Sequence, residues 1–213
     1  QVLEIDPNHS QAHNNLGVIF KTLSEKLKAI DYLKKAIKIN PDYADAHNNL
    51  GVIFKELGEY QKAKNCYEKA IAINPNYADA HSNLGIIYAV LGENEKAKSC
   101  HIKAIKIDPD YVNAHHRLGI IFRTLHDYQK AKECFERAIK INSNHSQTHN
   151  SLGDIYTELE ENEIAKECFE KAIKINPNYI HAYNNLGIIF MKLNDYQKAK
   201  DCFEKVIELN PNN

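Results

Sequence analysis

The sequence predicts an all-α fold, a solenoid of stacked antiparallel helix pairs. Glycine recurs every 34 residues, at positions 17, 51, 85, 119, 153 and 187, and leucine precedes each of these glycines. Proline keeps the same spacing at positions 7, 41, 75, 109, 177 and 211, and Ser143 takes the one missing place. A fixed period of this length is typical of a repeat architecture, in which each unit buries its apolar face against its neighbours.

The period divides residues 1–213, which we treat as a single array, into repeats. Residues 1–9 are predicted to be the end of a preceding repeat. Because the chain starts at Gln1 inside a predicted helix, we expect it to be a fragment of a longer protein. The six repeats that follow span 10–43, 44–77, 78–111, 112–145, 146–179 and 180–213.

Each repeat is predicted to form two helices, as residues 44–77 illustrate. Apolar residues recur at three- and four-residue spacing in two stretches, which is the period of an amphipathic helix. The first stretch contains Ala46, Leu50, Ile53, Phe54 and Leu57, and the second contains Ala63, Tyr67, Ala70, Ile71 and Ile73. Gly58 interrupts them, and Pro75 ends the second because proline cannot continue a helix. Gly51 has no Cβ, so another helix can approach it closely.

The composition excludes several function classes. The 27 Lys and Arg residues balance 28 Asp and Glu residues, for a net charge of −1. This balance gives no general attraction to nucleic acid or to an anionic membrane. RNA binding is also disfavoured because basic and aromatic residues do not alternate on the predicted binding face. The sequence has no long apolar run and no signal peptide pattern.

These features resemble the tetratricopeptide repeat family. The second repeat matches the family pattern at His47, Leu50, Gly51, Phe54, Ala63, Tyr67, Ala70 and Pro75. The departure is the first of these positions, where the family often has tryptophan and this chain has histidine in five repeats and Tyr183 in the sixth. The resemblance covers the whole chain. It implies a right-handed superhelical α-solenoid that acts as a non-catalytic protein–protein interaction scaffold and binds a peptide or partner segment in a concave groove.

The resemblance also implies which residues face this groove, because the first helix of each repeat lines it in the family. The groove-facing places are the second, fifth, sixth, ninth, twelfth and thirteenth of each repeat. The predicted peptide-binding residues are Asn14, Asn15, Val18, Lys21, Asn48, Asn49, Val52, Lys55, Asn83, Ile86, His116, Arg117, Ile120, Arg123, Asn150, Asp154, Asn184, Asn185 and Ile188.

Two features of this set suggest recognition. Asparagine at the sixth place carries a donor and an acceptor, so a row of asparagines could hold the backbone of an extended peptide. Similar ladders in O-GlcNAc transferases and SPINDLY-like proteins imply an alternative function, the substrate-recruiting region of a larger glycosyltransferase. In the fourth repeat His116, Arg117 and Arg123 form a predicted basic patch, and in the fifth Asp154 and Glu158 form an acidic one. Drift on a solvent-exposed face explains these changes nearly as well.

Two further columns of residues resemble chemical sites, but we expect them to be packing positions. All five cysteines occupy one repeat position, where equivalent helices lie about 8–10 Å apart. That spacing is too wide for a disulfide or for a shared zinc ion. The histidine column is expected to pack inside the apolar stripe and to destabilise the array below about pH 6. We find no catalytic motif, and no cofactor or metal is expected.

The identity of the partner protein or peptide is left open. The family members that clamp an acidic C-terminus need lysines where this chain has Asn48 and Asn113, so that partner is disfavoured. Unpaired thiols fit a reducing, cytoplasmic location. Val206 and Ile207 in the last predicted helix would normally face another repeat, so we expect end-to-end self-association.

Overall fold

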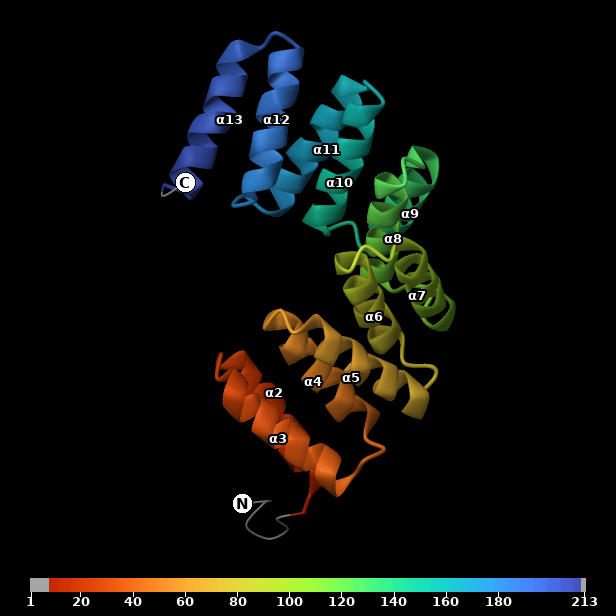
Figure 1. The fold of residues 1–213 in the computed structure, drawn as a ribbon. Coiled ribbons are helices and arrows are strands. Elements are labelled where there is room, and N and C mark those ends of the chain that lie inside the picture. Colours follow the sequence, from red (N-terminus) through yellow and green to blue (C-terminus); the bar gives the residue numbers. More distant parts are fainter. Residues whose placement is uncertain (1–7, 212–213) are drawn as a thin grey trace. The chain divides into compact units, whose positions relative to one another are not determined.

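The computed structural model describes residues 8–211, and every regular element in that range is a helix (Figure 1). The predicted helix at residues 1–5 lies outside the described residues. The helices follow the 34-residue period, two to a repeat, which confirms the predicted all-α solenoid. Their bounds are α2 Ser10–Thr22, α3 Lys26–Ile39, α4 Ala44–Glu56, α5 Tyr60–Ile73, α6 Ala78–Val90, α7 Asn94–Ile107, α8 Val112–Thr124, α9 Tyr128–Ile141, α10 Ser146–Glu158, α11 Asn162–Ile175, α12 Ile180–Lys192 and α13 Tyr196–Leu209.

The chain divides into two compact units, residues 1–109 and 110–213, and the same packing pattern occurs in each. The two helices of a repeat pack against each other as a hairpin, as α4 does with α5. The second helix of a repeat also packs on the first helix of the next, as α5 does on α6 and α11 on α12. Neither helix of a pair is apolar all round, so each repeat depends on its neighbours for burial.

The turn between the two helices of every repeat contains one residue in the left-handed region. Gly58 and Gly92 have φ near +75°, and the other repeats place Ser24, His126, Glu160 and Asn194 there with φ near +60°. In the second repeat the N–H of Glu59 donates to the carbonyl of Phe54, which is the six-to-one hydrogen bond of a Schellman motif. Gly58 therefore ends α4 as the sequence predicts, because glycine adopts positive φ without steric strain.

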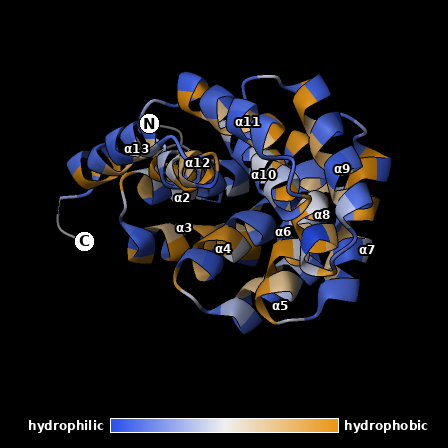
Figure 2. Cartoon of the chain, turned by 90° about the horizontal axis from the view of Figure 1, so that it is seen from above, coloured by the Kyte–Doolittle hydropathy of each residue, from blue (hydrophilic) through white to orange (hydrophobic). Residues whose placement is uncertain are grey.

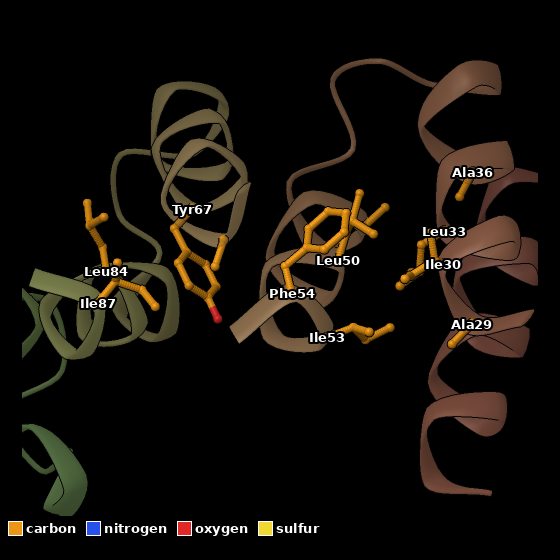
Figure 3. Close-up of a cluster of buried hydrophobic side chains, with 12 residues drawn as sticks. Ala29, Ile30, Leu33, Ala36, Leu50, Ile53, Phe54, Tyr67, Leu84 and Ile87 are labelled. Carbon is orange, nitrogen blue, oxygen red and sulfur yellow. The ribbon is translucent and has the colours of Figure 1, made fainter. Parts of the chain in front are cut away.

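The core of each unit is a continuous cluster of side chains from successive helices. In the first unit Leu33 of α3, Ile53 of α4 and Tyr67 of α5 are fully buried, together with Ile87 of α6 (Figure 3). Apolar and hydrophilic residues are mixed along the helices (Figure 2). A corresponding cluster in the second unit contains Phe135, Ile155 and Phe169.

The recurring glycine of the first helix allows a large side chain of the second helix to cross directly over it. A Cβ atom added to Gly119 would lie 2.6 Å from Cε1 of Phe135, and the ring of Phe135 is fully buried. The same place is crossed by Tyr67 at Gly51 and by Phe169 at Gly153. The predicted packing role of these glycines is therefore confirmed, and it sets the distance between the two helices of a repeat.

The histidine column has a structural role that the sequence pattern did not reveal. The Nε2–H of His47 donates to the carbonyl of Pro41 at 2.9 Å, and His81 makes the same bond to Pro75 at 3.0 Å. His149 donates to the carbonyl of Ser143 at 2.9 Å, where serine replaces proline. The imidazoles thus pack in the first helix, as expected, and also tie it to the turn that follows the preceding repeat.

The glycine contact gives a test of the core. We expect Gly119→Ala to lower the free energy of unfolding by about 1–2 kcal/mol, because overpacking outweighs the gain in helix propensity. Urea unfolding followed by circular dichroism measures the loss. In a Phe135→Ala background, which removes the ring, Gly119→Ala should cost nothing further, and an equal cost in both backgrounds would contradict the contact.

The last helix exposes apolar surface that the earlier second helices cover. Ile207 of α13 is 67% exposed, whereas its equivalents Ile71, Ile139 and Ile173 are half-buried. End-to-end association through this surface stays a prediction. Light scattering over a concentration series should show the apparent mass rising, and Ile207→Lys should reduce the rise. A constant mass at every concentration would rule the association out.

Candidate functional site

The first helices form the inner side of each unit. Within the first unit α2 packs on α4 and α4 on α6, and within the second α8 packs on α10 and α10 on α12. In the described part of the chain, no second helix packs closely on another second helix within a unit. Rows of helices that approach on one side and diverge on the other must curve, so the first helices line the concave face of each unit.

The structure buries most of the fifth-place residues that were predicted to face the groove. Asn14, Asn48, His116 and Asn150 are each less than a tenth exposed, while Asn184 is exposed. The expectation of an exposed fifth place is wrong for these four residues. They lie where the first helices of adjacent repeats meet, so their side chains contact the neighbouring helix and are not accessible to a ligand.

The asparagines of the fifth and sixth places bond to each other across the repeats. Nδ2 of Asn49 donates to Oδ1 of Asn14 at 3.0 Å, and Nδ2 of Asn83 donates to Oδ1 of Asn48 at 3.1 Å. Asn185 makes the same kind of bond to Asn150 at 3.3 Å. The asparagine ladder therefore joins first helices together, and the three sixth-place residues that donate these bonds are half-buried.

The ninth and twelfth places supply the more accessible part of the inner face. Val18 is 37% exposed and Ile188 is 41% exposed, and Val52, Ile86 and Ile120 are half-buried. Of the sixth-place residues, Asn15 and Arg117 are exposed, and the twelfth-place Lys21 and Lys55 are half-buried. Apolar side chains thus lie beside polar ones along the first helices.

The predicted basic and acidic patches are joined by one ion pair. Nη1 of Arg123 in α8 lies 2.5 Å from Oδ2 of Asp154 in α10. Oδ1 of Asp154 accepts a hydrogen bond of 2.9 Å from Nδ2 of Asn185 in α12. Burial nevertheless raises the pKa of the Asp154 carboxyl, and this outweighs the lowering by Arg123. Of the three residues predicted to form the basic patch, Arg123 is therefore paired with Asp154 across the contact between the two repeats.

A second compensating contact replaces the asparagine bond between the fourth and fifth repeats. Nδ1 of His116 lies 3.0 Å from the hydroxyl of Thr148, which lies 2.6 Å from Nδ1 of His145. Thr148 is fully buried and occupies a place where the other repeats have alanine, as at Ala114 and Ala182. The sequence does indicate this contact, because the fourth repeat alone has His116 at its place and the fifth alone has Thr148.

The surroundings of His116 strongly oppose its protonation. Burial is the main cause that lowers the pKa of His116 to about 3, and electrostatic repulsion from His145, Arg117 and Arg123 adds to it. Burial and Arg117 also lower the pKa of His145. Both imidazoles are therefore neutral at physiological pH.

A cavity of about 450 Å³ opens on the inner face of the second unit. Arg123 and Asp154 lie on its wall together with Glu158, Asn185 and Ile188. Thr157, His126 and Tyr128 also line it, and Nδ1 of His126 lies 3.0 Å from the hydroxyl of Tyr128. Glu158 follows Asp154 by four residues, so both carboxylates lie on one face of α10.

The remaining chemical candidates are inert. All five cysteines are free thiols, and burial raises the pKa of Cys66, Cys100, Cys134 and Cys168 to about 11. The protonated thiol is a weak nucleophile and a poor metal ligand. Within residues 8–211, no three His, Cys, Asp or Glu side chains are grouped as a metal site would need. Over the same range, no helix is long and apolar enough to cross a membrane.

The lowered pKa values predict acid destabilisation. A histidine whose folded pKa lies below its unfolded value near 6.5 stabilises the fold fully above pH 6.5, and this contribution is lost as pH falls toward 3. His116 alone should cost about 1.4 kcal/mol of unfolding free energy at pH 5.5. Urea unfolding at pH 7.5 and 5.5 measures this loss. His116→Asn, which restores the residue of four other repeats, should flatten the pH dependence, and an unchanged slope would contradict the assignment.

Comparison with known proteins agrees with this architecture. Family models described as tetratricopeptide repeat or TPR repeat match residues 44–77 and 181–213, residues 76–144, and residues 28–58 and 153–194. A search of curated proteins finds no match.

Several solved structures share the fold. PilF of Pseudomonas aeruginosa superposes with a TM-score of 0.85 at 22% identity, over 96% of this chain and 93% of that one. A chain of the APC/C hetero-tetramer Cut9–Hcn1 gives a TM-score of 0.90 at 16% identity, and this chain covers 42% of it. YrrB, described as a TPR protein with an unusual peptide-binding site, gives 0.63 at 22% identity, over 84% of this chain and 93% of that one. The matched regions together cover residues 28–144 and 153–213, and so this chain belongs to the tetratricopeptide repeat family.

Proposed function

We propose that this chain is a non-catalytic interaction scaffold that binds a partner protein through a peptide segment on the inner face of its first helices. The observation that carries the proposal is the row of accessible ninth-place residues. Val18 and Ile188 are more than a third exposed on helices that otherwise pack closely. Such side chains lose contact with water when a peptide covers them, which favours binding.

Polar groups beside this row would set the direction of the bound segment. Arg117 and Asn15 are exposed, and Lys21 and Lys55 are half-buried next to the apolar residues. A peptide backbone needs donors and acceptors when it leaves water, and these side chains supply both kinds. Apolar contacts with a few polar groups between them are the usual composition of a peptide-binding surface.

The alternative function, recruitment of substrates for a larger glycosyltransferase, would use the same face. In that case asparagines would hold the backbone of the substrate. One amide hydrogen of Asn49 and one of Asn83 already bond to the preceding repeat. The second amide hydrogen and the Oδ1 atom of each are left for a ligand. A scaffold with a specific partner should bind peptides that share side chains. A substrate-recruiting region should bind peptides that share only an extended backbone.

Peptide selection on the immobilised chain tests the proposal. Phage-displayed peptides should be enriched, and one of them, labelled, should bind in a fluorescence polarisation assay. Val18→Glu/Ile188→Glu places one glutamate on the inner face of each unit, so it should weaken binding by about tenfold or more whichever unit holds the peptide, because a glutamate under the peptide must be desolvated.

The control is the same pair of substitutions on the second helices. Ile102 of α7 is 36% exposed and Ile164 of α11 is 41% exposed, which matches Val18 and Ile188 closely. Ile102→Glu/Ile164→Glu should leave the affinity unchanged. Equal weakening by both pairs, or no enriched peptide, would refute binding on the inner face.

A further inference from the structure

The cavity on the inner face of the second unit has a polar and an apolar wall. Asp154 and Glu158 of α10 lie on one side, and Ile188 of α12, which is 41% exposed, lies on another. A side chain that fills such a cavity needs an apolar stem and a polar end. Lysine and arginine have a long aliphatic stem with a polar end. Glutamate and glutamine have the same construction with a shorter stem.

The charges decide between these side chains. The formal charges at the cavity are one positive, on Arg123, and two negative, on Asp154 and Glu158, which leaves one excess negative charge. Arg123 is already paired with Asp154 at 2.5 Å. Glu158 is exposed and has no ion-pair partner among residues 8–211, so its charge is free to attract a ligand.

Asp154 adds to this attraction in spite of its pairing. Its two oxygens accept one hydrogen bond from Arg123 and one from Asn185. A carboxylate can accept about four hydrogen bonds, so sites remain on both oxygens. Because the carboxylate is largely buried, an added positive charge nearby would be favourable.

We propose that this cavity is a subsite for a basic side chain of the partner, with arginine or lysine as the residue that enters it. The aliphatic stem would lie against Ile188, and the cationic end would bond to Glu158 and Asp154. This inference rests on the proposed function, since it names the chemistry of one residue in the bound segment. An acidic side chain is disfavoured because Arg123 has its partner and the excess charge is negative.

Small probes test the subsite without any knowledge of the partner. n-Butylguanidinium and butyrate carry equal stems and opposite charges, and they can be titrated at pH 7.5 into the full chain while amide NMR signals are followed. n-Butylguanidinium should shift the amides of Thr157, Asn185 and Ile188, and butyrate should shift them far less. Equal shifts with both probes, no shift with either, or stronger shifts with butyrate would overturn the inference.

The repeat supplies variants that should fold. Asp154→Ile introduces the residue that the third, fourth and sixth repeats carry at that place, and Glu158→Thr introduces the residue of the first and fourth. The double variant leaves Arg123 as the only charge at the cavity, so the preference should reverse toward butyrate. Persistence of the basic preference would overturn the assignment. Glu158→Thr alone, which changes one exposed side chain, should weaken n-butylguanidinium binding by about tenfold.

A matched control and a separate readout complete the experiment. Glu56 occupies the same repeat place as Glu158 and is exposed in the first unit. Glu56→Thr should leave both titrations unchanged. If n-butylguanidinium binds but no peptide is enriched, the proposed function alone is refuted. If peptides are enriched but the chain does not prefer n-butylguanidinium to butyrate, the subsite alone is refuted.

Discussion

The contact between the recurring glycine and the ring above it is the constraint on which the rest of the array depends. At Gly119 and Phe135 the two helices of a repeat approach so closely that a single added methyl group would overlap the ring. This fixes the distance and rotation of the two helices. Their apolar stripes then present one combined surface to the next repeat, and stacking becomes the only way to bury it.

Because the spacing between the helices is nearly constant, a substitution at a position between two helices must be compensated by a substitution in the adjacent helix. Where most repeats place an asparagine pair, the fourth and fifth place His116 and Thr148. Where most repeats place an apolar residue at the ninth position, the fifth places Asp154, which receives Arg123 from one side and Asn185 from the other. A buried polar group without a partner would be costly, so the substitutions occur as bonded sets.

These bonded sets change how the inner face is interpreted. Polar residues that look like recognition groups in the sequence are partly used to join helices. The accessible remainder is a row of aliphatic side chains, a few polar groups and the cavity beside Glu158. Binding on this face would therefore depend on apolar contacts along its length. Charge would select the side chain of the ligand only at the cavity beside Glu158. A scaffold of this kind can keep its packing residues fixed while its exposed positions vary.

The sequence by itself determined the repeat length, the two helices of each repeat, the glycine that ends α4 at residue 58 and the packing role of Gly119. These follow from local rules, because helix period, proline and glycine act over a few residues. It also predicted that cysteine and histidine columns are packing positions, although not the bond from His47 to Pro41.

The candidate site was predicted less well. Periodicity places the fifth and sixth residues side by side on one helix, but it does not show how far the next helix covers each of them. Only the tertiary structure decided that Asn48 and His116 are buried and that Arg123 is paired with Asp154. The physical reason is that burial and ion pairing depend on residues 31 to 35 positions away in the sequence, across a contact between two repeats.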